Sequence, residues 1–169
     1  MDQSIINFAV YEDGNEYVGM ANATLPTLTA LTQAVSGAGI AGNIEAVIAG
    51  HFDTMSLTLN FRTITKQAIR LQEPRRHNLT LRVAQQGEDA MAGQITVDGV
   101  KHVFVVVPKT FNGGSVAPAS PADASGEYAV RYWATYINGE KNLEIDPINF
   151  ICLVNGTDYL AKVRKALGK

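Results

Sequence analysis

The chain has 169 residues and a formal net charge of −2, and 18% of its residues are charged, against about 25% in a typical domain. A single domain of this size can fold without disulfides, and the one cysteine, Cys152, lies in an apolar run where we expect it to be buried. The low charge indicates a surface that either associates non-specifically or is covered by partners, and the scattered Lys and Arg argue against a nucleic-acid reader with a basic stripe. We expect no secretory signal, no membrane insertion and folding in a cytosol.

The first third of the chain alternates between polar and apolar residues, which is typical of strands. Ser4–Tyr11 and Glu16–Ala21 flank a turn-forming segment and predict a first hairpin. Thr24–Val35 alternates without a strongly apolar side, and this indicates a strand at an edge or an interface, where Pro26 is tolerated. Ser36–Gly50 is rich in glycine and has no Lys or Arg, so we expect a flexible or tightly turning loop.

The middle of the chain predicts three strands, one helix and one loop. Asp53–Arg62 alternates as a half-buried strand does, and Ile64–Glu73 has apolar residues at helical spacing and ends at a proline. Two further strand regions follow, in the second of which Asp98-Gly99 suggests a turn or bulge. Gly, Pro, Ser and Ala then predict a long exposed loop. The two strand regions and the loop are Asn78–Gln86, Gly93–Pro108 and Lys109–Gly126.

The stretch Glu127–Asn155 predicts a long antiparallel ribbon around Asn138-Gly139, the dipeptide that most favours a two-residue hairpin turn. With Ile137 and Glu140 beside the turn, the register is fixed. The predicted opposed pairs are Tyr136 with Lys141, Ala134 with Leu143, Tyr132 with Ile145, and Arg131 with Asp146. One face of this ribbon is apolar and the other charged, which is typical of a sheet covered on one side. Thr157–Leu167 predicts a terminal helix capped by Thr157 or Asp158. The chain is therefore expected to be a single, mainly β domain over residues 1–169, with antiparallel strands, one internal helix and one short C-terminal helix.

Outside the ribbon, three sets of residues could mark a ligand-binding or metal site. Gly37–Gly42 matches G-x-G-x-x-G, the pattern of a dinucleotide site, but the strand before it is not apolar and no strand–helix alternation follows. A nucleotide- or small-molecule-binding β-barrel using this loop is nevertheless the alternative function. The histidines at 51, 77 and 102 have no metal-ligand spacing, so neither a metal nor a cofactor is expected. The cluster Arg75-Arg76-His77, with Arg70 and Arg82 nearby, fits either a phosphate or acidic partner, or a solvated helix end.

The carboxylates of Glu144 and Asp146 are two residues apart on one face of the ribbon, so they point the same way. Such a pair could serve acid–base catalysis, and a hydrolase is the third hypothesis. Because they lie opposite Arg131 and beside Trp133, salt bridges within or between subunits are the favoured interpretation. We therefore expect no enzyme activity and no catalytic residue.

The run Asn138–Leu160 resembles the end of the major tail tube protein of contractile-tailed phages. The residues that carry this resemblance are Glu144-Ile145-Asp146, Ile148-Asn149, Asn155-Gly156, Asp158, Leu160, the basic helix Lys162–Lys165 and Gly168. A weaker match runs from Thr24-Leu25-Pro26 through a strand into the glycine-rich loop Gly37–Asn43. The same resemblance extends to tailocins and related contractile injection systems, and a type VI secretion tube protein is similar in fold.

The resemblance implies a β-barrel-like fold of two packed sheets flanked by a helix. It further implies hexameric rings that stack into a hollow tube inside a contractile sheath, with baseplate, tube-initiator and terminator proteins as partners and DNA or effectors passing through the lumen. The subunit would belong to a virion or phage-tail-like particle assembled in the bacterial host cytoplasm. In the family an extended element reaches the neighbouring ring, and here the loop at about 36–50 is the candidate. Its contact candidates are Ser36, Gly37, Gly39, Ile40, Gly42, Asn43, Ile44 and Glu45, and the candidates for charge pairing are Arg131, Glu144 and Asp146.

Overall fold

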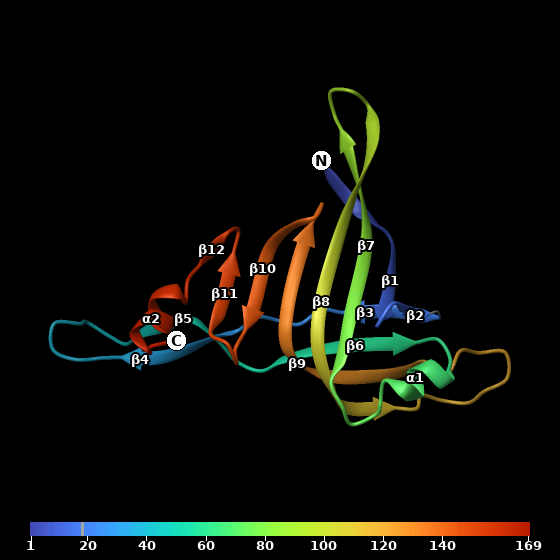
Figure 1. The fold of residues 1–169 in the computed structure, drawn as a ribbon, viewed down its shortest axis with the longest axis horizontal. Helices are drawn as coiled ribbons and strands as arrows, with labels where there is room; N and C mark the ends of the chain where they lie inside the picture. The colour runs from blue at the N-terminus through green and yellow to red at the C-terminus, as the bar shows by residue number, and fades with distance from the viewer. Residues whose placement is uncertain (18) are drawn as a thin grey trace.

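A computed structural model describes residues 1–17 and 19–169, and it is mainly β with antiparallel strands and two short helices (Figure 1). This confirms the predicted fold class. The elements are β1 (Asp2–Glu12), β2 (Asn15–Tyr17), β3 (Met20–Thr24), β4 (Ala30–Val35), β5 (Ile44–Phe52), β6 (Met55–Phe61), α1 (Lys66–Arg70), β7 (His77–Asp89), β8 (Gln94–Asn112), β9 (Ala124–Ile137), β10 (Glu140–Asp146), β11 (Ile151–Val154), β12 (Thr157–Asp158) and α2 (Ala161–Ala166).

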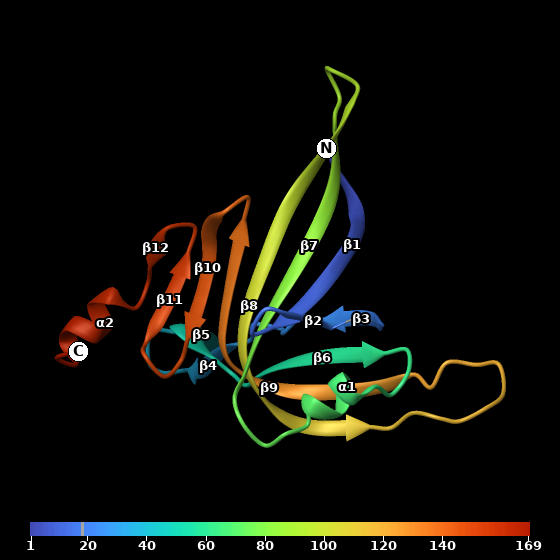
Figure 2. The same cartoon turned by 45° about the vertical axis from the view of Figure 1, so that its right-hand side comes forward.

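Ten strands form one antiparallel sheet that bends into two layers, and β4 and β5 form a second, two-stranded sheet. The larger layer has the order β12-β11-β10-β9-β8-β7-β1-β2, and β6 pairs with both β9 and β3 in the other layer. In Figure 2 β6 and the first part of β9 run across the direction of β1, β7 and β8. The two layers share β8 and β9, because the first part of β9 pairs with β6 and its last part with β10.

A β-bulge at Arg131 marks the bend. Val105 lies opposite Tyr132 but Val106 lies opposite Val130, so Arg131 is an extra residue in β9. An extra residue reverses which side chains point inward. Accordingly Tyr128 and Val130 are buried before the bulge, and Trp133 is buried after it.

The core fills the space between the two layers and is lined by alternate residues of β6, β7, β8 and β9. β6 alternates as its sequence predicts, with Met55, Leu57, Leu59 and Phe61 all buried. Helix α1 closes one end of this core through Ala68 and Leu71, which are also buried. Its first turn is capped by the Thr65 hydroxyl, which accepts a hydrogen bond from the Ala68 amide at 3.2 Å.

Several strands, loops and turns differ in their bounds from those that the sequence predicts. Thr24–Val35 is not one strand, because it divides into the end of β3 and β4. Asp98-Gly99 forms no turn and lies inside β8, where Gly99 opposes Ala84. The loop predicted for Lys109–Gly126 shortens to residues 113–123, since both flanking strands extend into it. Thr157 and Asp158 form β12, so the terminal helix begins only at Ala161.

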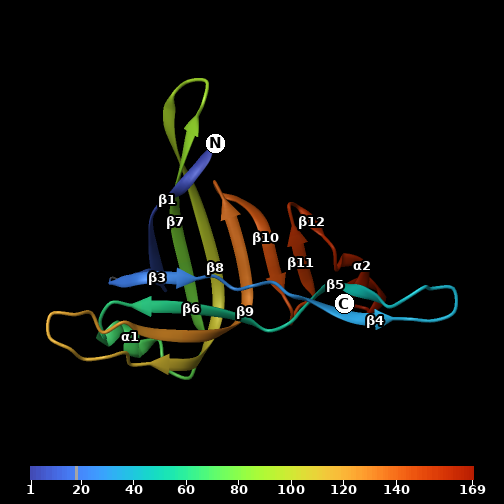
Figure 3. The same cartoon turned by 180° about the vertical axis from the view of Figure 1, so that it is seen from behind.

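Three elements project from the two layers (Figures 1 and 3). The β4–β5 hairpin extends to one side, and the loop of residues 113–123 extends to the other. The turn between β7 and β8 stands at the top beside the N-terminus, and α1 lies near the bottom. Across residues 1–17 and 19–169, neither helix has the length and apolar character that a membrane crossing requires.

Candidate functional site

The β4–β5 hairpin, residues 30–52 and here called the arm, is the most distinct surface element. Its two strands pair with each other, as in Val35 opposite Ile44 and Thr32 opposite Val47, and they belong to a sheet of their own. A lone two-stranded hairpin is only marginally stable in water. The arm therefore needs contacts beyond its own strand pairing to be stable.

One face of the arm is mostly apolar and open to solvent. Val35 lies opposite Ile44 and Gln33 opposite Ala46 on this face, and strand alternation places Leu31 and Ile48 on the same side. Between 39% and 55% of each of the four large apolar residues is exposed. The other face is mixed, because the Thr32 hydroxyl donates to the Glu45 carboxylate at 2.6 Å beside Val47. Contiguous exposed apolar side chains of this kind mark a contact surface.

The predicted contact residues gather at the outer end of the arm. Residues 36–43 form the turn, in which the Ile40 amide donates to the Gly37 carbonyl at 3.1 Å. Gly39 and Gly42 have φ angles of +92° and +138°, which other residues rarely adopt. Ile44 and Glu45 begin β5, so the prediction that all of Ser36–Gly50 is a loop is wrong over its second half. A strand follows the glycines where a dinucleotide site needs the N-terminus of a helix.

The root of the arm is fixed against the C-terminal part of the chain. Gly50 has a φ of +72°, and a Cβ placed there would lie 2.5 Å from the Leu160 side chain. The Asp53 amide also donates to the Thr29 carbonyl at 2.8 Å. A cavity of about 260 Å³ lies at this junction, lined by Leu31, Gly50, His51, Phe52, Ile145, Pro147, Phe150, Ile151 and Leu160. The tight contact at Gly50 sets the direction in which the arm leaves the body.

The β9–β10 ribbon has the predicted turn but only part of the predicted register. Asn138 and Gly139 adopt φ angles of +49° and +83°, and Tyr136 lies opposite Lys141 as expected. A bulge then occurs at Asn142, so every later pair shifts by one residue. Leu143 opposes Thr135 and Ile145 opposes Trp133, and the predicted pairs with Ala134 and Tyr132 are wrong. An extra residue in each strand, at Arg131 and Asn142, carries no sequence signature.

The charges of the ribbon have partners other than those predicted. Glu144 forms an ion pair with Lys141 and accepts a hydrogen bond from the Tyr132 hydroxyl at 3.0 Å. Burial, together with the hydrogen bond to Glu144, raises the pKa of Tyr132 to about 12. The carboxylate of Asp146 is buried and accepts the amides of Ile148 and Asn149, both at 3.1 Å.

The predicted pairing of Arg131 with Asp146 inside one chain is therefore wrong. Arg131 is exposed at its bulge and forms no ion pair within the described part of the chain. Asp146 instead caps a turn, and Glu144 neutralises Lys141. Pairing of these groups between subunits remains a prediction.

A buried charged cluster that the sequence did not predict joins β1, β2, β7 and the segment between α1 and β7. Glu12 is 1% exposed, and its carboxylate accepts hydrogen bonds from Tyr17, from His77 Nδ1 at 2.7 Å and from Arg75 at 3.2 Å. The other ring nitrogen of His77 lies 2.9 Å from the Glu73 carbonyl oxygen. Burial alone would raise the pKa of Glu12, but the hydrogen bonds from Tyr17 and His77 outweigh it and lower that pKa.

The other histidines lie elsewhere in the fold. His102 Nδ1 is 2.8 Å from the Thr135 hydroxyl, and burial lowers the pKa of His102. His51 Nδ1 contacts the Ala49 carbonyl at 3.1 Å. Within residues 1–17 and 19–169 no group of three His, Cys, Asp or Glu side chains has the arrangement of a metal site.

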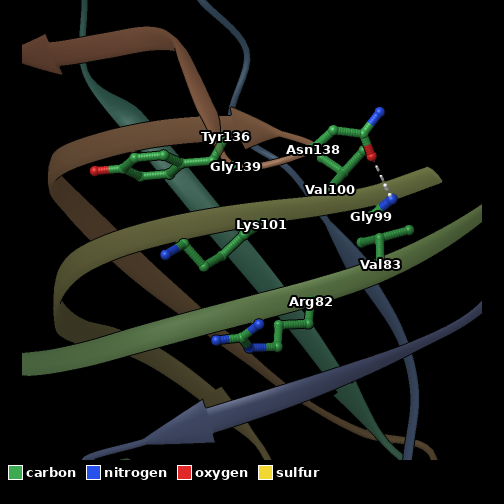
Figure 4. Close-up of a pocket in the computed structure, with 8 residues that line it drawn as sticks. All are labelled: Arg82, Val83, Gly99, Val100, Lys101, Tyr136, Asn138 and Gly139. Atoms are coloured by element: carbon green, nitrogen blue, oxygen red, sulfur yellow. Dashed lines mark hydrogen bonds between the residues drawn. The ribbon is translucent and has the colours of Figure 1, made fainter.

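The predicted basic cluster is divided in the structure. Arg75 turns towards Glu12 and His77 is buried, whereas Arg82 lies on the sheet beside Lys101 and Tyr136 (Figure 4). This second group lines an open pocket of about 260 Å³. Lys101 Nζ lies 4.4 Å from the centre of the Tyr136 ring, so a cation–π contact holds the lysine.

Two comparisons with known proteins bear on these surfaces. A family model described as "Phage tail tube protein FII" matches residues 2–168. The comparison with curated proteins gives no match.

Proposed function

Because this chain belongs to the family of phage tail tube protein FII, we propose that six copies of it close into a ring and that rings stack into the hollow tube of a contractile tail. Membership of the family makes the chain a structural subunit of a tail tube and a component of a virion. The family is structural and not a family of enzymes. The finer statements on ring, sheath and cargo are the proposal.

The observation that carries the proposal is the arm. In an isolated subunit, a marginally stable hairpin with one exposed apolar face is unfavourable, because exposing that face to water costs free energy. A repeating assembly can cover the same face once in every subunit. We therefore assign the arm to the contact with a subunit of the neighbouring ring, made through its outer residues. Those residues are Ser36, Gly37, Gly39, Ile40, Gly42, Asn43, Ile44 and Glu45.

The charges of the ribbon serve the same assembly. Arg131 is exposed without an ion pair in the described chain, and it is our candidate to meet a carboxylate of a neighbouring subunit. Glu144 and Asp146 then act by fixing the local shape of the ribbon through Lys141 and the turn at Ile148.

The proposed tube lies inside a contractile sheath and is started and ended by baseplate, initiator and terminator proteins. DNA in a phage, or effectors in a phage-tail-like injection particle, would pass through the lumen without specific binding. Assembly would take place in the cytoplasm of the bacterial host. No cofactor is needed for any of these steps.

The test is electron microscopy of concentrated purified protein, with class averages of views along the axis. We expect six-fold rings and hollow rods. Ile44→Lys should fold normally, since Ile44 is exposed, yet fail to form rods because a charge enters the apolar face of the arm. Val116→Lys is the matched control, since Val116 is a fully exposed apolar residue in the loop of residues 113–123. Rods of normal length from Ile44→Lys would refute the assignment of the arm.

A further inference from the structure

The β7–β8 turn and the strand ends beside it, residues 86–97, form an acidic and apolar surface that is here called the tip. Met91 is 99% exposed, and Ile95 and Val97 are also largely exposed. The acidic residues are Glu88 and Asp89, with Asp2 on the adjacent β1, and there is no Lys or Arg between residues 83 and 100. The N-terminal ammonium of Met1, which donates to the Glu88 carbonyl at 2.6 Å, is a single positive charge against these three carboxylates. Apolar side chains this exposed at the end of a projecting hairpin mark a contact surface.

The opposite end of the molecule is basic and apolar. Residues 62–76, here called the base, surround α1 and contain five Lys or Arg but only one acidic residue, Glu73. Within the described part of the chain Arg75 is the only one of these five cations in an ion pair. The side chains of Lys66 and Arg70 are exposed, and Ile64 and Ile69 beside them are about half exposed.

The tip and the base lie at opposite ends of the molecule. Figures 1, 2 and 3 differ by rotation about the vertical axis, and in each the β7–β8 turn is at the top and α1 is near the bottom. The arm extends sideways from this direction. Tip and base are therefore separate surfaces from the arm, and a contact between the tip of one copy and the base of another would be a second contact between rings.

We propose that the tip of each copy docks on the base of a copy in the next ring, with the acidic and apolar residues of the tip meeting the cations and isoleucines of the base. This inference rests on the proposed stacking of rings and identifies a second surface that makes the stack. Tip against tip or base against base would bring like charges together, which disfavours both arrangements. Contact between two different surfaces at opposite ends of a subunit can repeat without closing, as a filament requires.

Each ion pair at such a surface contributes little, because water and salt screen it. The contact is repeated by every subunit of a ring, so the individual contributions act together. We therefore expect stacking to weaken as salt rises, since the screening length falls from about 10 Å at 0.1 M to about 3 Å at 1 M ionic strength.

Charge reversal tests the proposal. Asp2→Lys, Ala90→Lys and Gln94→Lys place three lysines against Glu88 and Asp89 and make the tip basic. Arg62→Glu, Lys66→Glu and Arg70→Glu leave two arginines against four glutamates and make the base acidic; all six side chains are exposed. Either set alone should raise the protein concentration needed for rods by roughly tenfold or more, the effect of about one lost unit of log affinity. All six substitutions together should restore rods. Lys162→Glu with Lys165→Glu, on α2, is the matched control and should leave rods unchanged.

Two results would overturn the proposal: rods at the normal concentration from either reversed end, or no recovery when both ends are reversed. Single six-fold rings from a reversed end would leave the ring proposal intact, so the two ideas fail separately. A second measurement, disulfide crosslinking between the tip and the base, does not depend on the formation of rods. The variant Met91→Cys/Ile69→Cys should form a ladder of disulfide-linked oligomers under oxidation, and the absence of a ladder would also overturn the proposal.

Discussion

Replacing Glu12 by glutamine tests the buried cluster that joins β1, β2, β7 and the segment between α1 and β7. The carboxylate accepts hydrogen bonds from Tyr17, His77 and Arg75, and an amide at this position can offer only one acceptor oxygen while its NH2 group faces donors. Arg75 is 39% exposed, so its charge is not left buried, and the expected loss is that of a hydrogen bond to a charged group, about 1.5–3 kcal/mol. For a domain of this size that corresponds to a fall of roughly 3–12 °C in the melting midpoint.

The assay is urea unfolding of wild type and Glu12→Gln, with Glu16→Gln as the control. Glu16 lies on the same hairpin but is exposed, so its replacement should change the free energy of unfolding by less than about 0.5 kcal/mol. If Glu12→Gln proves no less stable than Glu16→Gln at neutral pH, the cluster does not stabilise the fold and the reasoning fails.

The dependence on pH has a definite sign. The folded state lowers the pKa of Glu12 below its ordinary value of 4.5. The ionised carboxylate therefore stabilises the fold fully above that value, and this stabilisation is lost as the pH falls through the lowered pKa. The difference in unfolding free energy between wild type and Glu12→Gln should shrink in the same acidic range, and a difference that stays constant down to pH 2 would contradict the assignment.

Three further outcomes are expected. Gly50→Ala should lower the free energy of unfolding by about 1–3 kcal/mol, because it forces a Cβ into Leu160 at a positive φ. Gly14→Ala is the control for backbone strain alone, because Gly14 has a φ of +82° and open space around it. If both variants lose the same unfolding free energy, the clash with Leu160 is refuted. Burial raises the pKa of the Cys152 thiol, so a thiol reagent should label folded protein far more slowly than unfolded protein, and equal rates would show that the site is open. Burial raises the pKa of Tyr128 to about 12, so its phenolate absorbance should appear only near that pH, and earlier ionisation would mean a wetter core.

The strands and turns that depend on local pattern could be predicted from the sequence. The alternation of Met55–Phe61 and the turn at Asn138-Gly139 both appear as expected, because period-two burial and positive φ are properties of a few adjacent residues. The internal helix is also present, although α1 is shorter than Ile64–Glu73.

What the sequence could not provide depends on residues that are distant along the chain. The bulges at Arg131 and Asn142 change the register by one residue each, and only the pairing with other strands requires them. Glu12 and His77 meet across 65 positions, and nothing near either residue indicates the other. The sequence predicts a loop over Ser36–Gly50 because glycines dominate its composition, whereas β5 is defined by its pairing with β4 across the turn.

The sharing of β8 and β9 between the two layers has a mechanical consequence. Both strands are continuous through the bend, and they pair with each other on both sides of Arg131. Layers joined only by loops could shift against each other without breaking strand pairing. Here any such shift would have to break the pairing of β8 with β9, so the two layers move as one body, which suits a protein whose family forms a tube.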